Sequence, residues 1–380
     1  MKAVVMAGGK GTRLRPLTSN QPKPMIPIVN VPCMEHIVRL LKRHGFEDIL
    51  VTLEFMTEAV QAYFGDGAEW GVNIEYSVEE KPLGTAGSVK YAEDRLRERF
   101  VIVSGDALTD VDLTKVLTFH EERGAEATLV LKGVEDPSEF GIVEIQDDGR
   151  VSDFLEKPDE EEVFSYTANT GIYVLEPNVL QDIPADQEYD FSKELFPKLL
   201  EEGRPVYGYT MEGYWEDIGN IEQYMGAQRD VLDGKVQGIQ LPGERLGEGV
   251  YVGRDTRVDE DQLEGPVLLG DNVKVSPGAR LGPYSVLAPN TSVGAGASVA
   301  RSTVAEGTSI GEEADLDGAL IGRACSIGTR ARILEGSALG DVVSVGAEAT
   351  IAPGVTVFPN EYIDEGARIT ESLVPQEEGA

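Results

Sequence analysis

The chain has 380 residues, of which 67 are acidic and 33 basic, so its formal net charge at pH 7 is −34. A surface this negative repels nucleic acid and anionic lipid, so we expect neither as a partner. No apolar stretch approaches the roughly 18–20 residues of a membrane-spanning helix, and the N-terminus shows no export signal. The two cysteines, Cys33 and Cys325, are far apart in the sequence. We therefore expect no disulfide and a cytoplasmic location.

The acidic excess is spread along the chain, with a net charge of −22 in residues 1–240 and −12 in residues 241–380. One interpretation is adaptation to a halophilic, high-salt cytoplasm, where screening removes most of the self-repulsion. The alternative is an acidic protein without such adaptation. In either case an anion-binding enzyme should concentrate its few cations at its substrate. One group of cations near the motifs below is therefore informative: Lys10, Arg13, Arg15, Lys23 and Lys157.

A glycine-rich turn follows the first apolar run. Lys2–Met6 has the length of a strand, and the turn comes directly after it: Ala7, Gly8, Gly9, Lys10, Gly11, Thr12 and Arg13. Glycines in this position let backbone N–H groups approach an anion. Arg13 and Lys23 add two positive charges, which suits a polyphosphate. The turn is not a Walker loop, because GxxxxGK[ST] is absent, and it is not GxGxxG, because Leu14 stands where the third glycine would be.

Helices and strands alternate through residues 34–131. Apolar spacing predicts helices at Met34–His44, Thr57–Phe64, a segment that includes Leu96, and Thr114–Arg123, and strands at Ile49–Leu53, Val72–Val78, Phe100–Ser104 and Ala127–Leu131. This alternation is typical of an α/β sheet covered on both faces. Ligands of such sheets gather at the carboxyl ends of the strands, where the glycine turn and Asp106 would both lie.

Residues 141–232 continue with a hairpin signal, Asp147-Asp148-Gly149, between two strands. The predicted elements are strands at Gly141–Ile145, Val151–Phe154, Gly171–Leu175 and Val206–Tyr209, and helices at Phe191–Glu201 and Asn220–Leu232. From Leu263 the pattern changes, because an apolar residue recurs at every sixth position with two slips of phase, as far as Ile369. This period predicts a hexapeptide parallel β-helix of about six coils.

The runs GGKGTRLRPLT and PKPMIPIVNVP closely resemble the sugar-1-phosphate nucleotidylyltransferases. Those enzymes join a nucleoside triphosphate to a sugar 1-phosphate and release pyrophosphate. Five further motifs continue the resemblance in the expected order: PLGTAG (Pro82–Gly87), SGD (Ser104–Asp106), FLEKP (Phe154–Pro158), NTGIY (Asn169–Tyr173) and YWEDIG (Tyr214–Gly219). The resemblance implies a Rossmann-like nucleotidyltransferase domain at residues 1–240 and a left-handed parallel β-helix of hexapeptide repeats at residues 241–380.

Nucleotidyl transfer requires little from the protein besides neutralisation and alignment of two polyanions. The attacking phosphate is already ionised, so no protein nucleophile is needed. Taken singly, Asp106 and Asp217 are ordinary turn or capping residues. The resemblance implies that they form the pair that binds Mg²⁺, an ion that prefers oxygen ligands. It also implies that Arg13 and Lys23 stabilise the triphosphate and the developing charge.

The resemblance further assigns two binding sites. In the sugar phosphate site, Lys157 would hold the phosphate and Glu156 the sugar hydroxyls, with Gly141, Asn169 and Gly171 nearby. In the nucleotide site, the glycine turn would contact the phosphates, while Glu79, Glu80 and Gly84 would lie at the base. Neighbouring N1–H and N2–H₂ donors on guanine suit a carboxylate, whereas uracil and thymine carbonyls would be repelled. EEKPLGTAG with GYWEDIG looks most like the mannose-1-phosphate guanylyltransferases, with glucose-1-phosphate uridylyl- or thymidylyltransferase as the alternative.

Two other classes of protein are less favoured. Sugar acyltransferases with hexapeptide β-helices typically carry a histidine base in the helix domain, whereas all three histidines here precede residue 124. A catalytically silent regulatory subunit is disfavoured because the chain retains the residues to which the resemblance assigns the reaction: Arg13, Lys23, Asp106, Lys157 and Asp217. The ends and flat faces of β-helices usually associate or are capped, so we expect a homo-oligomer.

Overall fold

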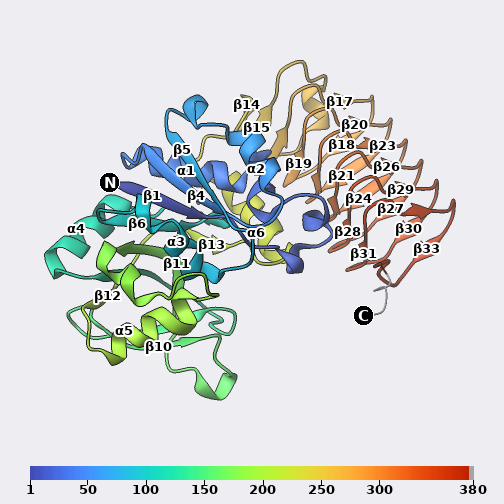
Figure 1. Cartoon of the computed structure of the whole chain (residues 1–380). Coiled ribbons are helices and arrows are strands. Elements are labelled where there is room, and N and C mark those ends of the chain that lie inside the picture. Colours follow the sequence, from blue (N-terminus) through green and yellow to red (C-terminus); the bar gives the residue numbers. More distant parts are fainter. Residues whose placement is uncertain (376–380) are drawn as a thin grey trace. The chain divides into compact units, whose positions relative to one another are not determined.

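The computed structural model describes residues 1–375, which form two compact units (Figure 1). The first contains Met1–Gly9 and Cys33–Asp217, and the second contains Lys10–Pro32 together with the chain from Ile218 onward. The ranges predicted from sequence patterns, 1–240 and 241–380, remain a prediction of domain limits. The compact units group the chain differently, since the segment Lys10–Pro32, which begins within the glycine turn, belongs with the β-helix.

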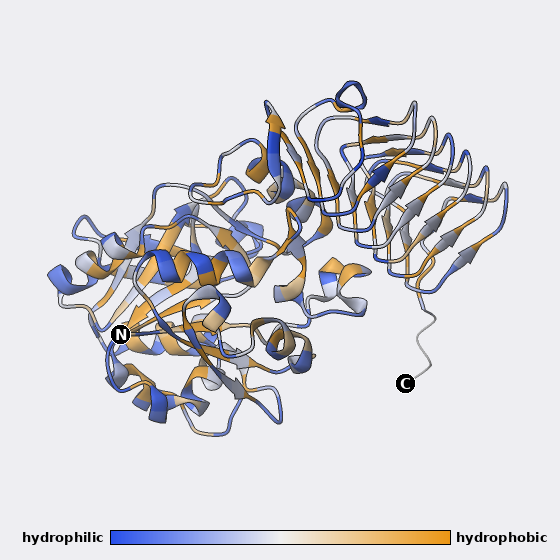
Figure 2. Ribbon diagram, turned by 90° about the horizontal axis from the view of Figure 1, so that it is seen from above, coloured by the Kyte–Doolittle hydropathy of each residue, from blue (hydrophilic) through white to orange (hydrophobic). Residues whose placement is uncertain are grey.

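One mixed sheet of nine strands forms the centre of the first unit, in the order β10-β9-β11-β6-β1-β4-β5, with β8 beside β11 and β12 beside β8. Its four strands β1, β4, β5 and β6 are parallel. Most of their apolar residues are buried, although Val78 at the end of β5 is 42% exposed. Figure 2 shows the hydrophobic residues of the ribbon in orange. The strands are β1 (Lys2–Met6), β4 (Asp48–Leu53), β5 (Asn73–Val78), β6 (Phe100–Ser104), β8 (Ala127–Gly133), β9 (Gly141–Ile145), β10 (Val151–Glu156), β11 (Thr167–Leu175) and β12 (Val206–Thr210). This confirms the predicted α/β class.

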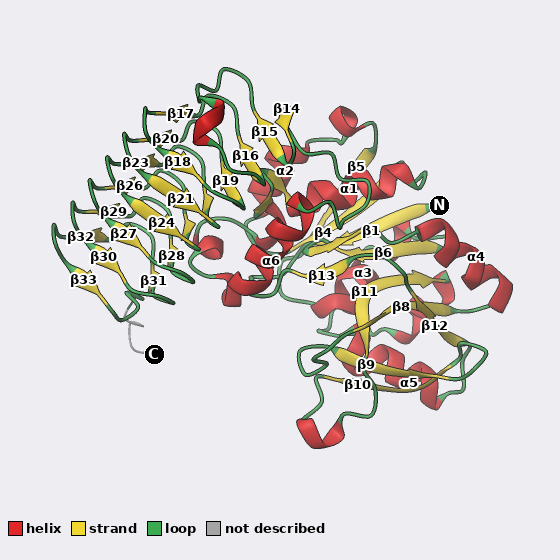
Figure 3. Ribbon diagram, turned by 180° about the vertical axis from the view of Figure 1, so that it is seen from behind, coloured by secondary structure: helices red, strands yellow, loops and turns green. Residues whose placement is uncertain are grey.

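Five α-helices pack beside this sheet (Figure 3). They are α1 (Cys33–Arg43), α2 (Thr57–Phe64), α3 (Gly84–Tyr91), α4 (Leu113–Arg123) and α5 (Phe196–Glu201). Short helical turns complete the unit: η4 (Ala68–Trp70), η5 (Glu93–Arg95), η6 (Glu160–Glu162), η7 (Pro177–Asp182) and the π-helical η8 (Phe191–Leu195). A separate two-stranded ribbon pairs β7 (Ala107–Thr109) with β13 (Trp215–Asp217).

The helix predicted to include Leu96 is wrong. The helical turn η5 ends at Arg95, and the α-helix of this region, α3, begins at Gly84 inside the PLGTAG motif. Glycine and threonine have low helix propensity, so the sequence gives little sign of a helix there. Packing decides instead: a Cβ at position 84 would lie 2.7 Å from the carbonyl oxygen of Tyr189, so only glycine fits against that backbone.

The second unit contains a three-sided parallel β-helix, which confirms the prediction from the six-residue period. Apolar residues of the repeat point inward and are almost fully buried, as Leu281, Val299 and Leu316 are. The first side consists of the parallel strands β15 (Val250–Val252), β16 (Val267–Leu269), β19 (Ser285–Leu287), β22 (Thr303–Val304), β25 (Leu320–Ile321), β28 (Ala338–Leu339) and β31 (Thr356–Val357). The strand β14 (Glu244–Gly247) extends this sheet by antiparallel pairing with β15.

The other two sides have six strands each. One consists of β17 (Lys274–Val275), β20 (Ser292–Val293), β23 (Ser309–Ile310), β26 (Ser326–Ile327), β29 (Ser344–Val345) and β32 (Tyr362–Ile363). The other consists of β18 (Arg280–Leu281), β21 (Ser298–Ala300), β24 (Asp315–Asp317), β27 (Arg332–Ile333), β30 (Thr350–Ile351) and β33 (Arg368–Ile369). The turn η9 (Glu260–Gln262) precedes them.

A column of glycines brings successive coils into close contact. A Cβ on Gly294 would lie 2.6 Å from the backbone of Gly311, and one on Gly311 would lie 2.7 Å from the backbone of Gly328. A Cβ on Gly328 would in turn lie 2.6 Å from the carbonyl carbon of Gly346. Real Cβ atoms essentially never approach so closely. Each coil therefore rests directly on the backbone of the next.

The second unit also includes the chain segment after the glycine turn and the helix α6 (Ile221–Leu232). The segment contains three helical turns, η1 (Thr12–Leu14), η2 (Leu17–Ser19) and η3 (Lys23–Met25), and the two-stranded hairpin β2 (Pro27–Ile28) and β3 (Val31–Pro32). Cys33 of the first unit and Cys325 of the second are both buried, and neither forms a disulfide. Among residues 1–375, no helix is both long and apolar enough to cross a membrane.

Candidate active site

The glycine turn and Asp106 follow two neighbouring parallel strands of the first unit. In the pairing of β1 with β6, Met6 lies opposite Ser104. The N–H of Gly105 donates to the carbonyl of Met6 at 2.8 Å, and the N–H of Ala7 donates to Thr52 at 3.0 Å. The structure therefore places the start of the turn and the start of the SGD motif side by side at the carboxyl edge of the sheet, where ligands of α/β proteins bind.

The ribbon of β7 and β13 brings the two predicted metal ligands together. The strands are antiparallel, and Asp217 lies opposite Ala107, the residue after Asp106. Both acids are half-buried, and the Ser104 hydroxyl donates a hydrogen bond to Oδ1 of Asp106. Two carboxylates from distant parts of the sequence therefore share one end of the sheet with the glycine turn.

Asp110 fixes the approach to β13. Its Oδ1 accepts the N–H of Tyr214 at 2.6 Å, and its own N–H donates to the carbonyl of Tyr214 at 3.2 Å. Gly213 has a φ of 92°, and a Cβ there would lie 2.4 Å from Oδ1 of Asp110, so the turn requires glycine. The indole N–H of Trp215 donates to Thr170 at 3.1 Å. Asp110 is thus a turn residue, but one on which the placement of Asp217 depends.

The donor set of this pair suits a hard divalent cation. Among residues 1–375, no group of three or more His, Cys, Asp or Glu side chains is arranged to hold a metal ion. Two carboxylates are nevertheless the usual protein contribution to Mg²⁺ that also binds substrate phosphates. Asp106 and Asp217 supply oxygen ligands only, so they fit Mg²⁺ better than a softer metal.

The predicted sugar phosphate residues also come together in the first unit. Glu156 pairs with Gly141 across β9 and β10, and a Cβ on Gly141 would lie 2.6 Å from Oε2 of Glu156. Burial raises the pKa of Glu156 above its usual range, and the nearby Asp190 raises it further, while Lys157 lowers it. Lys157 is exposed, and its N–H donates to Phe140 at 3.0 Å.

Asn169 connects this group to the carboxylate pair. Its Nδ2 donates to the Tyr173 hydroxyl at 2.9 Å and to the Ser192 hydroxyl at 3.2 Å, while its Oδ1 accepts the N–H of Gly171 at 3.3 Å. Gly171 lies beside the SGD motif, since a Cβ there would be 3.4 Å from Cβ of Ser104. Ser192 is not among the predicted site residues. Its signal is the Asp-Phe-Ser start of a helix, where Oδ1 of Asp190 accepts the Ser192 N–H at 2.8 Å.

The two acids before PLGTAG have different environments. Glu79 is buried, and its Oε2 accepts the N–H of Leu83 at 3.1 Å. Burial raises the pKa of Glu79, and hydrogen bonds from Ser88 and Leu83 partly offset that rise. Glu80 is exposed. Glu79 thus closes the loop that precedes α3, and of the two acids Glu80 is the one accessible to a ligand.

The predicted cationic residues lie on the segment Lys10–Pro32 of the second unit. Arg13 is exposed on η1, whereas Lys23 is only 9% exposed on η3. A Cβ on Gly11 would lie 3.0 Å from Cβ of Lys23, and the Thr18 hydroxyl donates to the carbonyl of Gly11 at 2.7 Å. Gly11, Thr18 and Lys23 are therefore packed together, and the lysine stem is fixed by this packing.

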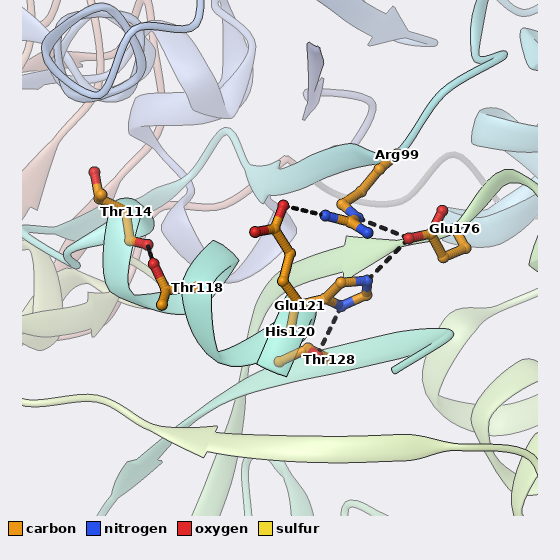
Figure 4. Close-up of polar contacts among 7 residues, drawn as sticks. All are labelled: Arg99, Thr114, Thr118, His120, Glu121, Thr128 and Glu176. Atoms are coloured by element: carbon orange, nitrogen blue, oxygen red, sulfur yellow. Dashed lines mark hydrogen bonds and ion pairs between the residues drawn. The ribbon is translucent and has the colours of Figure 1, made fainter. Parts of the chain in front are cut away.

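His120 is a structural residue of α4 (Figure 4). Its Nδ1 lies 2.8 Å from Oγ1 of Thr128, and its Nε2 lies 3.4 Å from Oε1 of Glu176. The same Glu176 oxygen accepts Nε of Arg99 at 2.7 Å. Burial lowers the pKa of His120, and the charge of Arg99 lowers it further. The ring is fully buried among these partners, so its role is structural.

Two family models match the chain. The model described as nucleotidyl transferase matches residues 2–234. The model described as the GMPPB C-terminal domain matches residues 263–374. The first covers the strands and loops that carry Asp106 and Asp217, and the second covers most of the β-helix.

Three relatives align with most of this chain. A UTP–glucose-1-phosphate uridylyltransferase of Synechocystis sp. is 40% identical over 350 residues, which are 88% of this chain and 90% of the relative. A mannose-1-phosphate guanylyltransferase of Mycobacterium tuberculosis is 37% identical over 281 residues, 73% of this chain and 77% of the relative. A mannose-1-phosphate guanylyltransferase catalytic subunit beta of Danio rerio is 32% identical over 377 residues, 96% of this chain and 98% of the relative.

A solved structure resembles the first part of the chain. The crystal structure of a glucose-1-phosphate thymidylyltransferase from Bacillus anthracis, in complex with a sucrose, is similar with a TM-score of 0.57 and 27% sequence identity. The match covers 63% of this chain and 98% of that one.

Proposed function

Because this chain belongs to the nucleotidyl transferase family, we propose that it makes GDP-mannose and pyrophosphate from GTP and mannose 1-phosphate. The observation that supports this most directly is the pairing of β7 with β13, which sets Asp217 beside Asp106 next to the glycine turn. Mannose-1-phosphate guanylyltransferases of several organisms align with nearly the whole chain, including the β-helix.

In the proposed reaction, a phosphate oxygen of the sugar 1-phosphate bonds to the α-phosphorus of the nucleotide. The bond from that phosphorus to the bridging oxygen breaks, and pyrophosphate leaves with the electron pair. Asp106 and Asp217 would hold Mg²⁺, which supplies neutralisation of phosphate charge. Arg13 and Lys23 would bind the triphosphate and stabilise the charge that develops on the leaving group.

The sugar phosphate would lie against β9, β10 and β11. Lys157 would bind the phosphate of this substrate. Glu156 and Asn169 would form hydrogen bonds with the sugar hydroxyls. The hydrogen bonds of Asn169 to Tyr173 and Ser192 fix the orientation of its amide. Gly141 and Gly171 leave space beside these polar groups. This arrangement of polar side chains beside two glycines suits a ligand that carries many hydroxyls.

Base selection in this proposal depends on Glu80. Its carboxylate is exposed, whereas that of Glu79 already accepts the Leu83 N–H. A carboxylate can accept two adjacent N–H groups of guanine, for which uracil has no equivalent. The second candidate function is synthesis of UDP-glucose from UTP and glucose 1-phosphate. It is favoured by the 40% identity to the Synechocystis uridylyltransferase.

Pyrophosphate release across GTP, UTP, dTTP, ATP and CTP, each with mannose 1-phosphate and with glucose 1-phosphate, tests this proposal. We expect the highest kcat/KM for GTP with mannose 1-phosphate. A higher kcat/KM for UTP or dTTP with glucose 1-phosphate would replace GDP-mannose synthesis with the second candidate. No turnover with any pair would refute nucleotidyl transfer to these sugars.

We also propose that the enzyme works as a homo-oligomer in a cytoplasm of high salt. The net charge of −34 supports the salt requirement, because dissolved ions screen the repulsion among 67 acidic side chains. Sedimentation at low and high KCl tests the assembly, and a monomer under both conditions would contradict it.

A further inference from the structure

The hairpin of β2 and β3 has an unfavourable backbone at its tip. Val29 and Asn30 connect the two strands with φ angles of 47° and 65°. Two-residue turns of this kind prefer Asn and Gly, because φ is positive at both positions. Asn30 fits that preference, but a β-branched residue at positive φ is a genuine outlier. Val29 is nevertheless fully buried, so the surrounding structure must hold the turn in place.

Helix α6 supplies two of the groups that hold this hairpin. Oε1 of Gln228 accepts the N–H of Val29 at 2.6 Å, and Nε2 of Gln228 donates to the Tyr224 hydroxyl at 2.8 Å. That hydroxyl donates to the carbonyl of Pro27 at 2.8 Å. The β-helix supplies the third group, since Nδ2 of Asn30 donates to the carbonyl of Leu287 at 3.0 Å. We call Gln228, Tyr224 and Asn30 the hairpin clamp.

Burial of the polar groups of the clamp costs free energy, so the geometry that they impose should have a role. Gln228 is 3% exposed and Tyr224 is 1% exposed. A leucine or methionine at position 228 would fill the same space without a polar group to satisfy. Gln228 instead uses both ends of its amide, one on Val29 and the other on Tyr224. Paired groups in a buried network specify one arrangement of the backbone they bind.

The hairpin is continuous with the turn that carries Lys23. The N–H of Ile26, which directly precedes Pro27, donates to the carbonyl of Lys23 at 3.1 Å. The stem of Lys23 packs in turn against Gly11. A shift of the hairpin would therefore be passed to Lys23 and to the start of the segment, where Arg13 lies. Shifts of about 1 Å in a group that binds reacting atoms can lower the rate about 100-fold.

We propose that Gln228 is a positioning residue for nucleotidyl transfer, which acts by fixing the hairpin that ends the segment of Arg13 and Lys23. This inference rests on the proposed function, in which those two cations bind the triphosphate. Gln228 bonds to Val29, Pro27 and Tyr224, none of which is a predicted nucleotide or sugar residue, so its effect on those residues is indirect. Substitution of Gln228 should change how the triphosphate is bound and leave the sugar phosphate site unaffected.

The test compares Gln228→Met with the same substitution at a second buried glutamine. Gln262 is 7% exposed, and its Nε2 donates to Ser276 at 2.8 Å and Ala279 at 3.1 Å, both of which belong to the β-helix. Both variants lose a buried amide, so both should lower Tm. We expect only Gln228→Met to lower kcat, by about tenfold or more, and to raise KM for the nucleotide. KM for the sugar 1-phosphate should change less than twofold.

Two further variants distinguish positioning from folding. Gln228→Glu keeps an acceptor for the Val29 N–H and should recover a large part of the kcat lost in Gln228→Met. Tyr224→Phe removes one hydroxyl from the clamp and serves if Gln228→Met does not fold; it should lower kcat several-fold. If kcat of both Gln228→Met and Tyr224→Phe stays within twofold of the wild-type value, the clamp is structural only.

Failure of the proposed function would give different kinetic results from failure of the positioning role of Gln228. A wild-type protein without turnover on any nucleotide and sugar phosphate would refute both proposals. Full activity of Lys23→Ala and Arg13→Ala would refute the roles of the two cations and, with them, the route by which Gln228 acts. Activity that depends on both cations but not on Gln228 or Tyr224 would refute the positioning role alone.

Discussion

Asp217 lies opposite Ala107 in the pairing of β13 with β7, so it is a neighbour of Asp106 although the two acids are distant in the sequence. The pairing is secured by Asp110, which binds both the N–H and the carbonyl of Tyr214. The position of Asp217 thus depends on Asp110, an acid to which we assign no role as a metal ligand. Loss of Asp110 should therefore affect metal binding without removing a ligand.

Removal of either acid of the pair should nearly abolish turnover. We expect Asp106→Asn and Asp217→Asn each to lower kcat by about 1,000-fold, because an amide cannot supply the charge that a bound Mg²⁺ requires. The far-ultraviolet circular dichroism and Tm should stay close to those of the wild type. Pyrophosphate release over a range of Mg²⁺ concentrations measures the effect. Asp147→Asn, in the exposed turn between β9 and β10, is the control. Turnover that persists with a chelator would contradict the metal role.

The two acids before α3 should respond differently to amide substitution. Glu80→Gln should lower kcat/KM for GTP and reduce the preference for GTP over UTP by about tenfold, since an amide offers one acceptor and a donor in place of two acceptors. Glu79→Gln should leave the preference unchanged, because its oxygen can still accept the Leu83 N–H. Competition between GTP and UTP measures the ratio. An equal effect of both variants would show that base selection does not depend on Glu80.

The β-helix should be stabilised by a change at Val342. This residue is 53% exposed and has a φ of 61°, which is strained for a β-branched side chain. Corresponding turns of other coils have Asn272, Asn290 and Asn360 at positive φ. Val342→Asn should therefore add about 1 kcal/mol of stability, seen as a rise of ~2 °C in Tm. The reverse change, Asn360→Val, should lower Tm. A fall in Tm for Val342→Asn would show that its side chain makes a stabilising contact.

Stability should decrease in mild acid because of His120. Burial lowers the pKa of this residue in the folded state, so the unfolded chain binds its proton at a higher pH. The contribution of neutral His120 to the stability of the fold is complete above pH 6.5, the usual pKa of a histidine. It is lost as the pH falls from there through the pKa of His120 in the folded state. Urea unfolding between pH 7.5 and 5 should show a shallower loss for His120→Gln than for the wild type. Parallel curves would mean that Glu176 and Glu121 hold the charged ring as well as the neutral one (Figure 4).

Salt should raise the stability of the chain. At a net charge of −34, self-repulsion opposes the compact state, and dissolved ions screen it. We expect Tm to rise by several degrees from about 0.1 M to 2 M KCl, since the Debye length falls from about 10 Å to below 3 Å. An equal ionic strength of NaCl is the control for a specific effect of potassium. A constant Tm would contradict adaptation to high salt.

Local patterns were sufficient for much of the fold. The six-residue period predicted the β-helix, because each inward residue such as Leu281 or Ile333 must be apolar whatever surrounds the coil. The strand Phe100–Ser104 and the helix Thr57–Phe64 have the predicted limits. Resemblance supplied the Asp106 and Asp217 pair, which no local pattern would have joined.

What the sequence did not reveal depends on contacts between distant segments. Helix α3 exists because Gly84 packs on the backbone of Tyr189, a contact that has no signature in the PLGTAG motif itself. In the sequence, nothing distinguishes Gln228 from the other polar residues of an amphipathic helix, because its hydrogen bond to Val29 depends on the tertiary structure. Ser192 meets Asn169 only through the register of β11 and the start of η8. Such pairings are set by tertiary packing, which one-dimensional periodicity does not encode.

The column of glycines from Gly294 to Gly346 limits how the sequence of this protein can evolve. Because each coil touches the backbone of its neighbour with no side chain between them, a single added methyl group would force two coils apart. Insertion or removal of one whole coil would leave every remaining contact as it was. Homologues should therefore differ in the length of this region by complete turns of the helix, and substitutions within the column should be rare.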